Sequence, residues 1–111
     1  MVSRPKYPKT DQNHTMVAEV LRKLDHHYMG IEFFLIDTSK AGGAMTDYLL
    51  IAGGKVHFVE VKVVGEENNL TLGERETQSL GVPFYIVTTA EQVVDMLMDI
   101  AEEVSDELRA V

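Results

Sequence analysis

Apolar and polar positions repeat along the chain with two different periods, and these periods divide it into helices and strands. From residue 11 or 13 to residue 28, apolar residues recur at the spacing of one helix face, and Gly30 follows as a stop signal. Residues 31–37 form a short apolar run bounded by Gly30 and the polar loop 39–43, a pattern typical of a strand. The chain is therefore expected to begin with a helix followed by a strand.

The next two apolar runs predict a β-hairpin. Residues 46–52 and 55–64 are rich in β-branched and aromatic residues, and only Gly53 and Gly54 separate them. A Gly-Gly pair accepts positive φ at both central positions of a tight turn. Such a turn also fixes the register, because the residue before the glycines then faces the residue after them.

The second half of the chain adds a helix, a strand and a final helix. Helical spacing runs from about residue 71 to residue 80, and the apolar run 82–89 is expected to be a buried strand. Thr88 followed by Glu91 matches a capping box, which opens a last helix with apolar residues at helical spacing. The predicted order is α-β-β-β-α-β-α, an α/β fold class.

Length and composition indicate one domain. A chain of 111 residues with 45% apolar residues can bury a single core. Residues 1–10 carry Pro5 and Pro8 among basic and polar residues, so we expect a flexible basic arm there and one domain over residues 11–111. No apolar run reaches the roughly 20 residues that span a bilayer, and the start lacks the apolar segment of a signal peptide. We expect a soluble, cytoplasmic protein with no membrane partner.

Charge and cysteine content narrow the function. The chain has no cysteine, which excludes disulfides, thiolate metal sites and cysteine nucleophiles. Its net charge of -8 argues against binding nucleic acid by bulk attraction, because phosphate contacts need Lys and Arg. The acids are concentrated, however: residues 90–111 hold seven of them against one Arg, whereas the first nine residues hold three basic residues and no acid. A surface segregated in this way can still present phosphate to one face.

The hairpin register brings two acids together. Asp47 falls directly opposite Glu60, with Cβ atoms about 5 Å apart. At an effective dielectric of about 20, two carboxylates at that distance repel by roughly 3 kcal/mol. A divalent cation shared by both would offset this cost, and Mg²⁺ is usually held by one or two carboxylates with water and substrate phosphate. Lys62, two residues beyond Glu60, projects from the same face of the strand.

An acid pair beside an amine suits phosphodiester hydrolysis. The metal polarises the phosphate and helps to generate hydroxide, while the Lys62 ammonium orients the nucleophile or stabilises developing charge. Val59, Val61 and Val63 point to the other face and anchor the strand in the core. His57 is expected on that face too, in a structural role. The alternative is a solvated sheet face on which Lys62 neutralises one acid.

The pattern of Asp47, then Glu60-Val61-Lys62 on the next strand, resembles the Asp…Glu-x-Lys signature of the PD-(D/E)XK nuclease superfamily. Within it, the chain is most similar to the phage-like, virus-type replication-repair nucleases called VRR-NUC domains and to archaeal-type Holliday junction resolvases, over about residues 19–97. The resemblance implies a restriction-endonuclease-like core, a mixed central β-sheet flanked by helices. It also implies Mg²⁺ or Mn²⁺ bound by Asp47, Glu60 and the backbone carbonyl of Val61.

Other positions relate less directly to the family pattern. Thr46 replaces the usual proline, and Glu74 stands near a frequent glutamine. We assign Glu74 to the surface or the first turn of its helix rather than to the metal site. The resemblance implies that Glu19, on the first helix, is an outer member of the catalytic site, although its place at the edge of the apolar stripe also fits a solvent-facing residue.

The function implied by the resemblance is that of a Mg²⁺-dependent endonuclease hydrolysing phosphodiester bonds in DNA. Branched, nicked or junction DNA in replication, repair or recombination is the implied substrate, and a homodimer the implied assembly. The candidate phosphate contacts are Arg4, Lys6, Lys9 and Lys40. Two alternatives stay open: a nuclease that prefers RNA, and a catalytically silent module of the same fold that binds a protein partner through its acidic last helix.

Overall fold

Two stretches of the chain, residues 15–40 and 46–110, are described by the computed structural model. The helices are α2 (Met16–Lys23), α3 (Leu72–Ser79) and α4 (Ala90–Arg109), and the strands are β1 (His27–Tyr28), β2 (Ile31–Glu32), β3 (Phe34–Asp37), β4 (Tyr48–Ala52), β5 (Lys55–Val61) and β6 (Phe84–Val87). None of these helices is long and apolar enough to cross a membrane. The predicted basic arm, with its candidate phosphate contacts Arg4, Lys6 and Lys9, lies outside the described residues.

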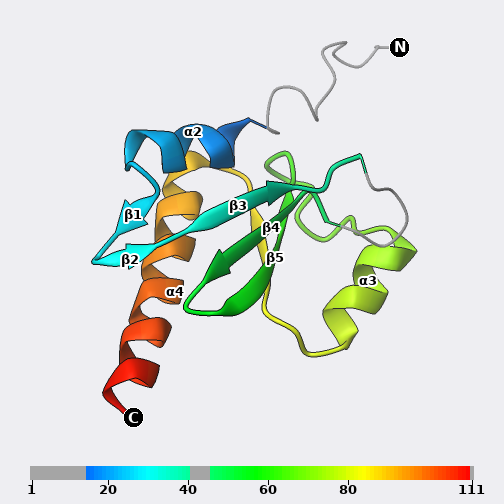
Figure 1. Cartoon of the computed structure of the whole chain (residues 1–111). Helices are drawn as coiled ribbons and strands as arrows, with labels where there is room; N and C mark the ends of the chain where they lie inside the picture. Colours follow the sequence, from blue (N-terminus) through cyan, green and yellow to red (C-terminus); the bar gives the residue numbers. More distant parts are fainter. Residues whose placement is uncertain (1–14, 41–45, 111) are drawn as a thin grey trace, which may run out of the picture.

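The main sheet is mixed. Its strand order is β3-β4-β5-β6, with antiparallel pairing from β3 to β5 and parallel pairing between β5 and β6. β1 and β2 form a separate two-stranded sheet. α2 and α4 lie together on one side of the main sheet, and α3 lies apart from them (Figure 1). The predicted α/β class with a mixed sheet and flanking helices is confirmed at this level.

The predicted hairpin forms in the predicted register. Ala52 of β4 pairs with Lys55 of β5, and the pairing continues in step along both strands. Gly53 and Gly54 form the turn with φ of 61° and 75°. A Cβ added at Gly53 would lie 2.6 Å from a side-chain atom of Val104 on α4. The turn therefore packs directly against the last helix, and this contact leaves no room for a side chain.

The first helix is shorter than predicted. α2 ends at Lys23 rather than at residue 28, because Asp25 and His26 take left-handed backbone conformations with φ of 57° and 59°. The amide of His26 then donates to the carbonyl of Leu21 at 2.8 Å, which closes the helix end. The chain turns there into β1.

The predicted strand 31–37 is in fact two strands in two sheets. β2 pairs with β1 around a tight turn at Met29 and Gly30, which have φ of 53° and 81°. The buried Phe33 separates β2 from β3. Sequence patterns missed this hairpin because methionine is uncommon at positive φ and gives no turn signal.

β6 differs from the predicted buried strand 82–89. It spans Phe84–Val87, and of its residues only Val87 is buried. The reason is its place at the end of the sheet order, where one side of a strand has no neighbouring strand.

The cap of the last helix lies one residue later than predicted. Thr89, not Thr88, is the N-cap, and its hydroxyl accepts a hydrogen bond from the amide of Gln92 at 3.1 Å. Thr88 instead donates through its amide and its hydroxyl to the side chain of Gln92. The predicted capping box of Thr88 and Glu91 is therefore wrong, although the helix begins where its pattern indicated.

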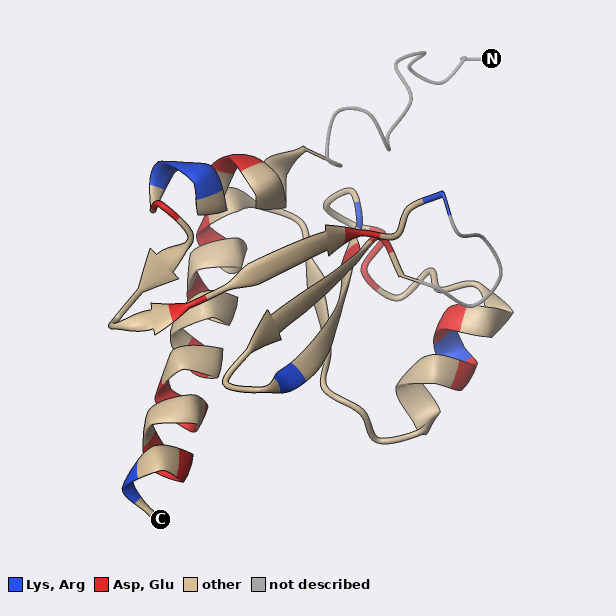
Figure 2. Cartoon of the chain, viewed as in Figure 1, with Lys and Arg blue, Asp and Glu red and all other residues tan. Residues whose placement is uncertain are grey.

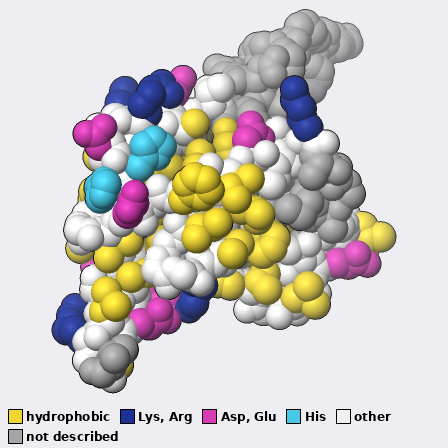
Figure 3. All heavy atoms as spheres, in the orientation of Figure 1, with side chains coloured by type: hydrophobic (Ala, Val, Ile, Leu, Met, Phe, Trp, Pro, Cys, Tyr) yellow, Lys and Arg dark blue, Asp and Glu magenta, His cyan; other side chains and the backbone are white. Residues whose placement is uncertain are grey.

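The two faces of the main sheet differ in their cover. The core lies between the sheet and helices α2 and α4, around residues such as Leu50, Val59 and Leu97. The opposite face remains accessible: Phe34 is 62% exposed and Val56 is 40% exposed. Apolar side chains gather over the strands in Figure 3. We call this surface the open apolar face, which the strand pairing assigns to Phe34, Ile36, Leu49, Ile51, Val56, Phe58, Phe84 and Ile86.

Candidate functional site

Asp47 and Glu60 meet at one end of the β4–β5 hairpin. Asp47 directly precedes β4, and its Oδ2 accepts a hydrogen bond from the backbone amide of Val61 at 2.9 Å. This bond fixes the aspartate beside the end of β5, one residue from Glu60. The negative charge of Asp47 also raises the pKa of Glu60. The structure thus brings together the two acids that the hairpin register placed opposite one another.

Glu60 is a buried acid with a strongly raised pKa. Its side chain is buried, and its Oε1 has no hydrogen-bond partner among the described residues. Burial, followed by the contact with Glu74 and the charge of Asp47, raises the pKa of Glu60 to about 8, against the opposing charge of Lys62. A buried carboxyl oxygen without a partner is costly, so this atom needs a proton or a cation.

Lys62 joins two carboxyl groups. Its Nζ lies 3.4 Å from Oε2 of Glu60 and 3.3 Å from Oε1 of Glu74. The side chain of Lys62 is only 15% exposed, so solvent screens these ion pairs weakly. The ammonium is therefore held in place on the Glu60 face of β5, as the alternation of the strand predicted.

Glu74 belongs to this cluster, contrary to the expectation of a helix-surface position. Glu74 does occupy the first turn of α3, which was the alternative expectation. Its side chain is not on the surface, however, because Glu74 is only 7% exposed. Its Oε1 accepts from the amide of Thr71 at 2.9 Å, and its own amide donates to the Thr71 hydroxyl at 3.1 Å. Burial alone would raise the pKa of Glu74, but the Thr71 amide, the Glu60 carboxyl and Lys62 together lower it.

The sequence did contain a signal for this role of Glu74. Thr71 and Glu74 form a capping-box pair, which orients the glutamate back toward the start of its helix. The start of α3 follows the loop from β5, so a side chain directed there faces Lys62. Only the folded loop reveals that direction.

Glu19 and Asp37 lie at the edge of the site. Glu19 of α2 is exposed, yet its charge acts on the buried Tyr48. Burial first, and then the charges of Asp37, Asp47 and Glu19, raise the pKa of Tyr48 to about 12. Asp37, at the end of β3, pairs with Tyr48 across the sheet and was not singled out in the sequence. The charges of Glu19, Asp37 and Asp47 thus all act on Tyr48.

Other predicted positions take different roles. Lys40 is exposed and follows β3, beside residues that the structure does not describe. Val61 is buried, and its amide binds Asp47, while its carbonyl as a metal ligand stays a prediction. His57 is buried on the core face and its Nδ1 lies 3.0 Å from the carbonyl oxygen of Leu50, so its expected structural place is confirmed.

For a divalent cation, the site offers two carboxylate ligands, Asp47 and Glu60. Within residues 15–40 and 46–110, no group of three or more His, Cys, Asp or Glu is arranged to hold a metal ion. Asp47 and Glu60 offer the oxygen donors that Mg²⁺ and Mn²⁺ prefer, and the partnerless Glu60 Oε1 is the atom that a cation would satisfy. Mg²⁺ commonly takes its remaining ligands from water and substrate.

Comparison of the chain with models of known protein families, with curated proteins and with solved structures finds no match.

Proposed function

We propose that this protein is a divalent-metal-dependent endonuclease that hydrolyses phosphodiester bonds in DNA. The observation that carries the proposal is the buried Glu60 carboxyl, which lacks a partner at Oε1 and lies between an aspartate and a lysine. The Asp…Glu-x-Lys resemblance and the mixed sheet with flanking helices support the same reading, with a restriction-endonuclease-like topology and branched or nicked DNA as the proposed substrate.

The roles of the residues follow from their positions. Asp47 and Glu60 would hold Mg²⁺ or Mn²⁺, with the Val61 carbonyl as a further ligand, and a bound cation supplies a Lewis acid for phosphate and water. Lys62 donates to the attacking or developing anionic oxygen, because its ammonium is fixed beside Glu60 at 3.4 Å. Glu74 orients Lys62 through its 3.3 Å contact.

DNA is proposed to approach the site from the basic parts of the chain. Lys40 follows β3, which ends at Asp37 near the acid cluster. We assign phosphate contacts to Lys40 and, in the N-terminal segment, to Arg4, Lys6 and Lys9. Glu19 is proposed as an outer residue of the site that acts on its charge balance through Tyr48.

A metal titration and a cleavage assay test the proposal together. Mn²⁺ is expected to bind the wild type at one site and to broaden the amide signals of β5 next to Glu60. Cleavage is measured on labelled single-stranded, duplex, flapped and four-way substrates, each as DNA and as RNA. Asp47→Asn, Glu60→Gln and Lys62→Met are expected to lower cleavage about a hundredfold or more, while Glu32→Gln, an exposed control on β2, leaves it unchanged.

The controls separate the rival functions. Cleavage of RNA alone would replace the DNA proposal by an RNA-directed nuclease. Metal binding without cleavage of any substrate, or equal Mn²⁺ binding by wild type and Asp47→Asn, would leave a silent module of this fold.

The Glu74→Gln variant tests the positioning of Lys62. Gln keeps an oxygen acceptor for the Thr71 amide, so the helix cap is retained. A lower cleavage rate of this variant therefore reports the positioning of Lys62 rather than loss of the cap.

The open apolar face is the proposed site of homodimer formation, through its part around Phe34 and Val56, because Glu60 lies at the other end of the same face and must stay accessible to DNA. The four strands have 4, 5, 7 and 4 residues, which gives the sheet a footprint of roughly 320 Å² at about 4.8 Å between strands. A standard interface buries about 800 Å² on each partner. The face therefore supplies less than half of such an interface, and surrounding loops must supply the rest. We propose a weak, concentration-dependent dimer.

A further inference from the structure

β6 presents a backbone edge away from β5. Among the described strands it pairs with β5 alone. The carbonyls of Pro83 and Val87 accept hydrogen bonds from the amides of Phe58, in β5, and Lys62, just after it, at 2.9 and 3.0 Å. Because successive residues of a strand direct their backbone groups to opposite sides, Phe84 and Ile86 direct theirs away from the sheet. The edge thus offers the donors and acceptors that an added strand needs.

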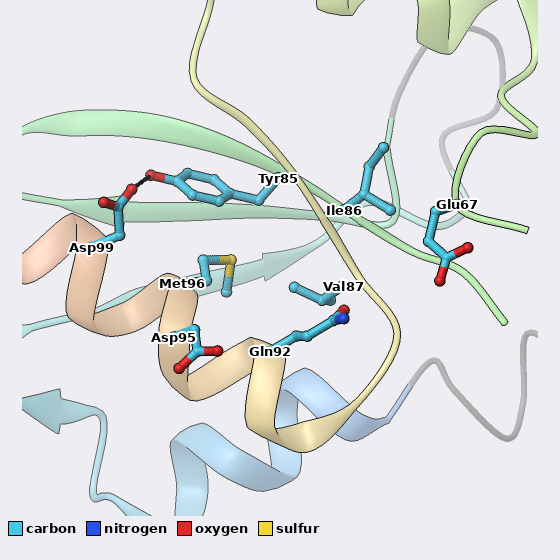
Figure 4. A pocket seen from close by; sticks show the side chains of 8 residues that line it. All are labelled: Glu67, Tyr85, Ile86, Val87, Gln92, Asp95, Met96 and Asp99. Carbon is cyan, nitrogen blue, oxygen red and sulfur yellow. Dashed lines mark hydrogen bonds between the residues drawn. The ribbon is translucent and has the colours of Figure 1, made fainter. Parts of the chain in front are cut away.

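Two adjoining hollows run beside this edge, between β6 and α4. One has a volume of about 330 Å³ and is lined by apolar side chains such as Val87 and Met96. The other has a volume of about 590 Å³ and continues past Pro83. Tyr85 and Asp99 line both, and the Tyr85 hydroxyl donates to Asp99 at 2.6 Å (Figure 4). The two hollows therefore meet at this hydrogen bond and together follow the strand, and we call the pair the groove.

The groove is acidic along its whole length. No Lys or Arg is among the residues that line either hollow. Figure 2 shows acidic positions along α4 from one end to the other. Lys55 offsets part of this charge at the far end, where it contacts Glu103 and Glu107 at 3.4 and 3.0 Å. The acids that line the groove are Glu67, Asp95, Asp99, Glu102, Glu103, Asp106 and Glu107.

We propose that the groove binds an extended basic segment of a partner protein, which adds to the sheet as an antiparallel strand beside β6. The residues of the partner that form hydrogen bonds lie opposite Phe84 and Ile86. Their side chains therefore lie on the open apolar face, and we expect these partner residues to be apolar. The residues between them point toward α4 and are Lys or Arg, which complement the acids of the groove. The recognised pattern is an alternation of basic and apolar residues.

The charge of the groove and the pattern of the strand exclude other occupants. Nucleic acid is repelled by the acids that line it. The basic N-terminal segment of this chain has the sequence Arg4-Pro5-Lys6, in which the residue between the bases lacks an amide hydrogen. That residue would have to donate to β6, so the segment fits the edge poorly. This inference does not depend on the proposed nuclease activity.

Binding of a synthetic peptide to the full chain tests the inference. The probe is a capped peptide of about eight residues, the length of a strand, that alternates Lys or Arg with Val. We expect amide shifts in Phe84, Ile86 and the groove side of α4, and a Kd measured by fluorescence anisotropy. A peptide of the same composition with its bases and valines in two blocks is expected to bind about tenfold more weakly, because it cannot place all its bases over α4.

Two matched comparisons separate strand addition from simple charge attraction. Asp95→Asn with Asp99→Asn is expected to weaken binding about tenfold, whereas Glu32→Gln with Glu76→Gln, which remove the same charge outside the groove, should not. N-methylation of the valines should abolish binding, and N-methylation of the bases should not.

The inference is overturned if both methylated peptides bind equally, if the blocked peptide binds as well as the alternating one, or if the two pairs of variants have the same effect. Displacement of the probe by a peptide of residues 1–10 would also overturn it, in favour of an occupant from the chain itself.

Discussion

At the scale of single residues, the site depends on carboxyl groups held closer together than their charges favour. Glu60 and Glu74 share Lys62, and one lysine cannot compensate two buried carboxylates and the nearby Asp47. Glu60 therefore keeps its proton to a pH far above the ordinary range for a glutamate, with a pKa of about 8. This arrangement lowers stability at neutral pH and provides a place for a cation.

The raised pKa of Glu60 predicts a pH-dependent stability. Its pKa rises from 4.5 in the unfolded chain to about 8 in the folded one, so the stabilising effect of the bound proton is fully present below pH 4.5 and is lost as the pH rises toward 8. Glu60→Gln removes this dependence. We expect the variant to exceed the wild type in free energy of unfolding by about 2 kcal/mol or more at pH 8.5, and to approach it at pH 4.5.

Urea unfolding at a series of pH values without divalent metal measures this difference. Glu32→Gln, on the exposed part of β2, is the control and should follow the wild type at every pH. A constant difference between Glu60→Gln and the wild type from pH 4.5 to 8.5 would contradict the assignment.

At the scale of elements, the β4–β5 hairpin is placed by its turn. The strands pair in the register set by Gly53 and Gly54, and this register brings Asp47 to the end of β5. The turn touches α4 at Val104, so the last helix fixes the position of the hairpin within the core. The site is therefore sensitive to a contact at the far end of the same two strands.

The two turn glycines are expected to differ in their tolerance of alanine. Gly54 has φ of 75° and nothing within 4 Å of an added Cβ, so Gly54→Ala carries only the backbone strain, about 1–2 kcal/mol. Gly53→Ala has the same strain and also places its Cβ 2.6 Å from Val104. Its cost is expected to be larger, about 2–4 kcal/mol. Chemical denaturation of both variants measures the difference, and equal costs would show that α4 yields to the added methyl group.

At the scale of the whole molecule, the described helices cover the two faces of the sheet unequally. α2 and α4 bury one face, whereas the open apolar face carries Phe34 at 62% and Val56 at 40% exposure. Aromatic and β-branched residues on all strands of a sheet face are typical of a surface that becomes covered. The acids of the groove lie on α4, on the opposite side of the sheet from this face, so only the apolar side chains of a strand added beside β6 would adjoin a second copy.

The uncovered face predicts self-association that depends on apolar contact. The wild type is expected to shift from monomer to dimer with increasing concentration, in the micromolar to millimolar range, in sedimentation or light-scattering measurements. Phe34→Lys with Val56→Lys should leave a monomer throughout that range. Leu72→Lys is the control, because Leu72 is 75% exposed on α3, outside the face. A wild type that stays monomeric at millimolar concentration would refute the proposed dimer.

Sequence by itself determined the parts of this protein that depend on neighbours in the chain. The glycine pair and the alternation of the flanking residues set the hairpin register, and with it the meeting of Asp47 and Glu60 and the placement of Lys62 on the same face. Helical spacing located α3 and α4 to within a residue or two. These features were predictable because turn geometry and strand alternation act over a few residues.

Tertiary structure decided the rest. The left-handed residues Asp25, His26 and Met29 are not glycines, and the amide of Phe33 donates to the carbonyl of His26 at 2.8 Å, a contact outside the local pattern. Glu74 reaches Lys62 only because the loop after β5 returns α3 to the site. The edge position of β6 and the groove beside α4 depend on strand order, which local sequence does not encode. Contacts between distant segments are set by the packing of the whole core, and a pattern along the chain cannot specify them.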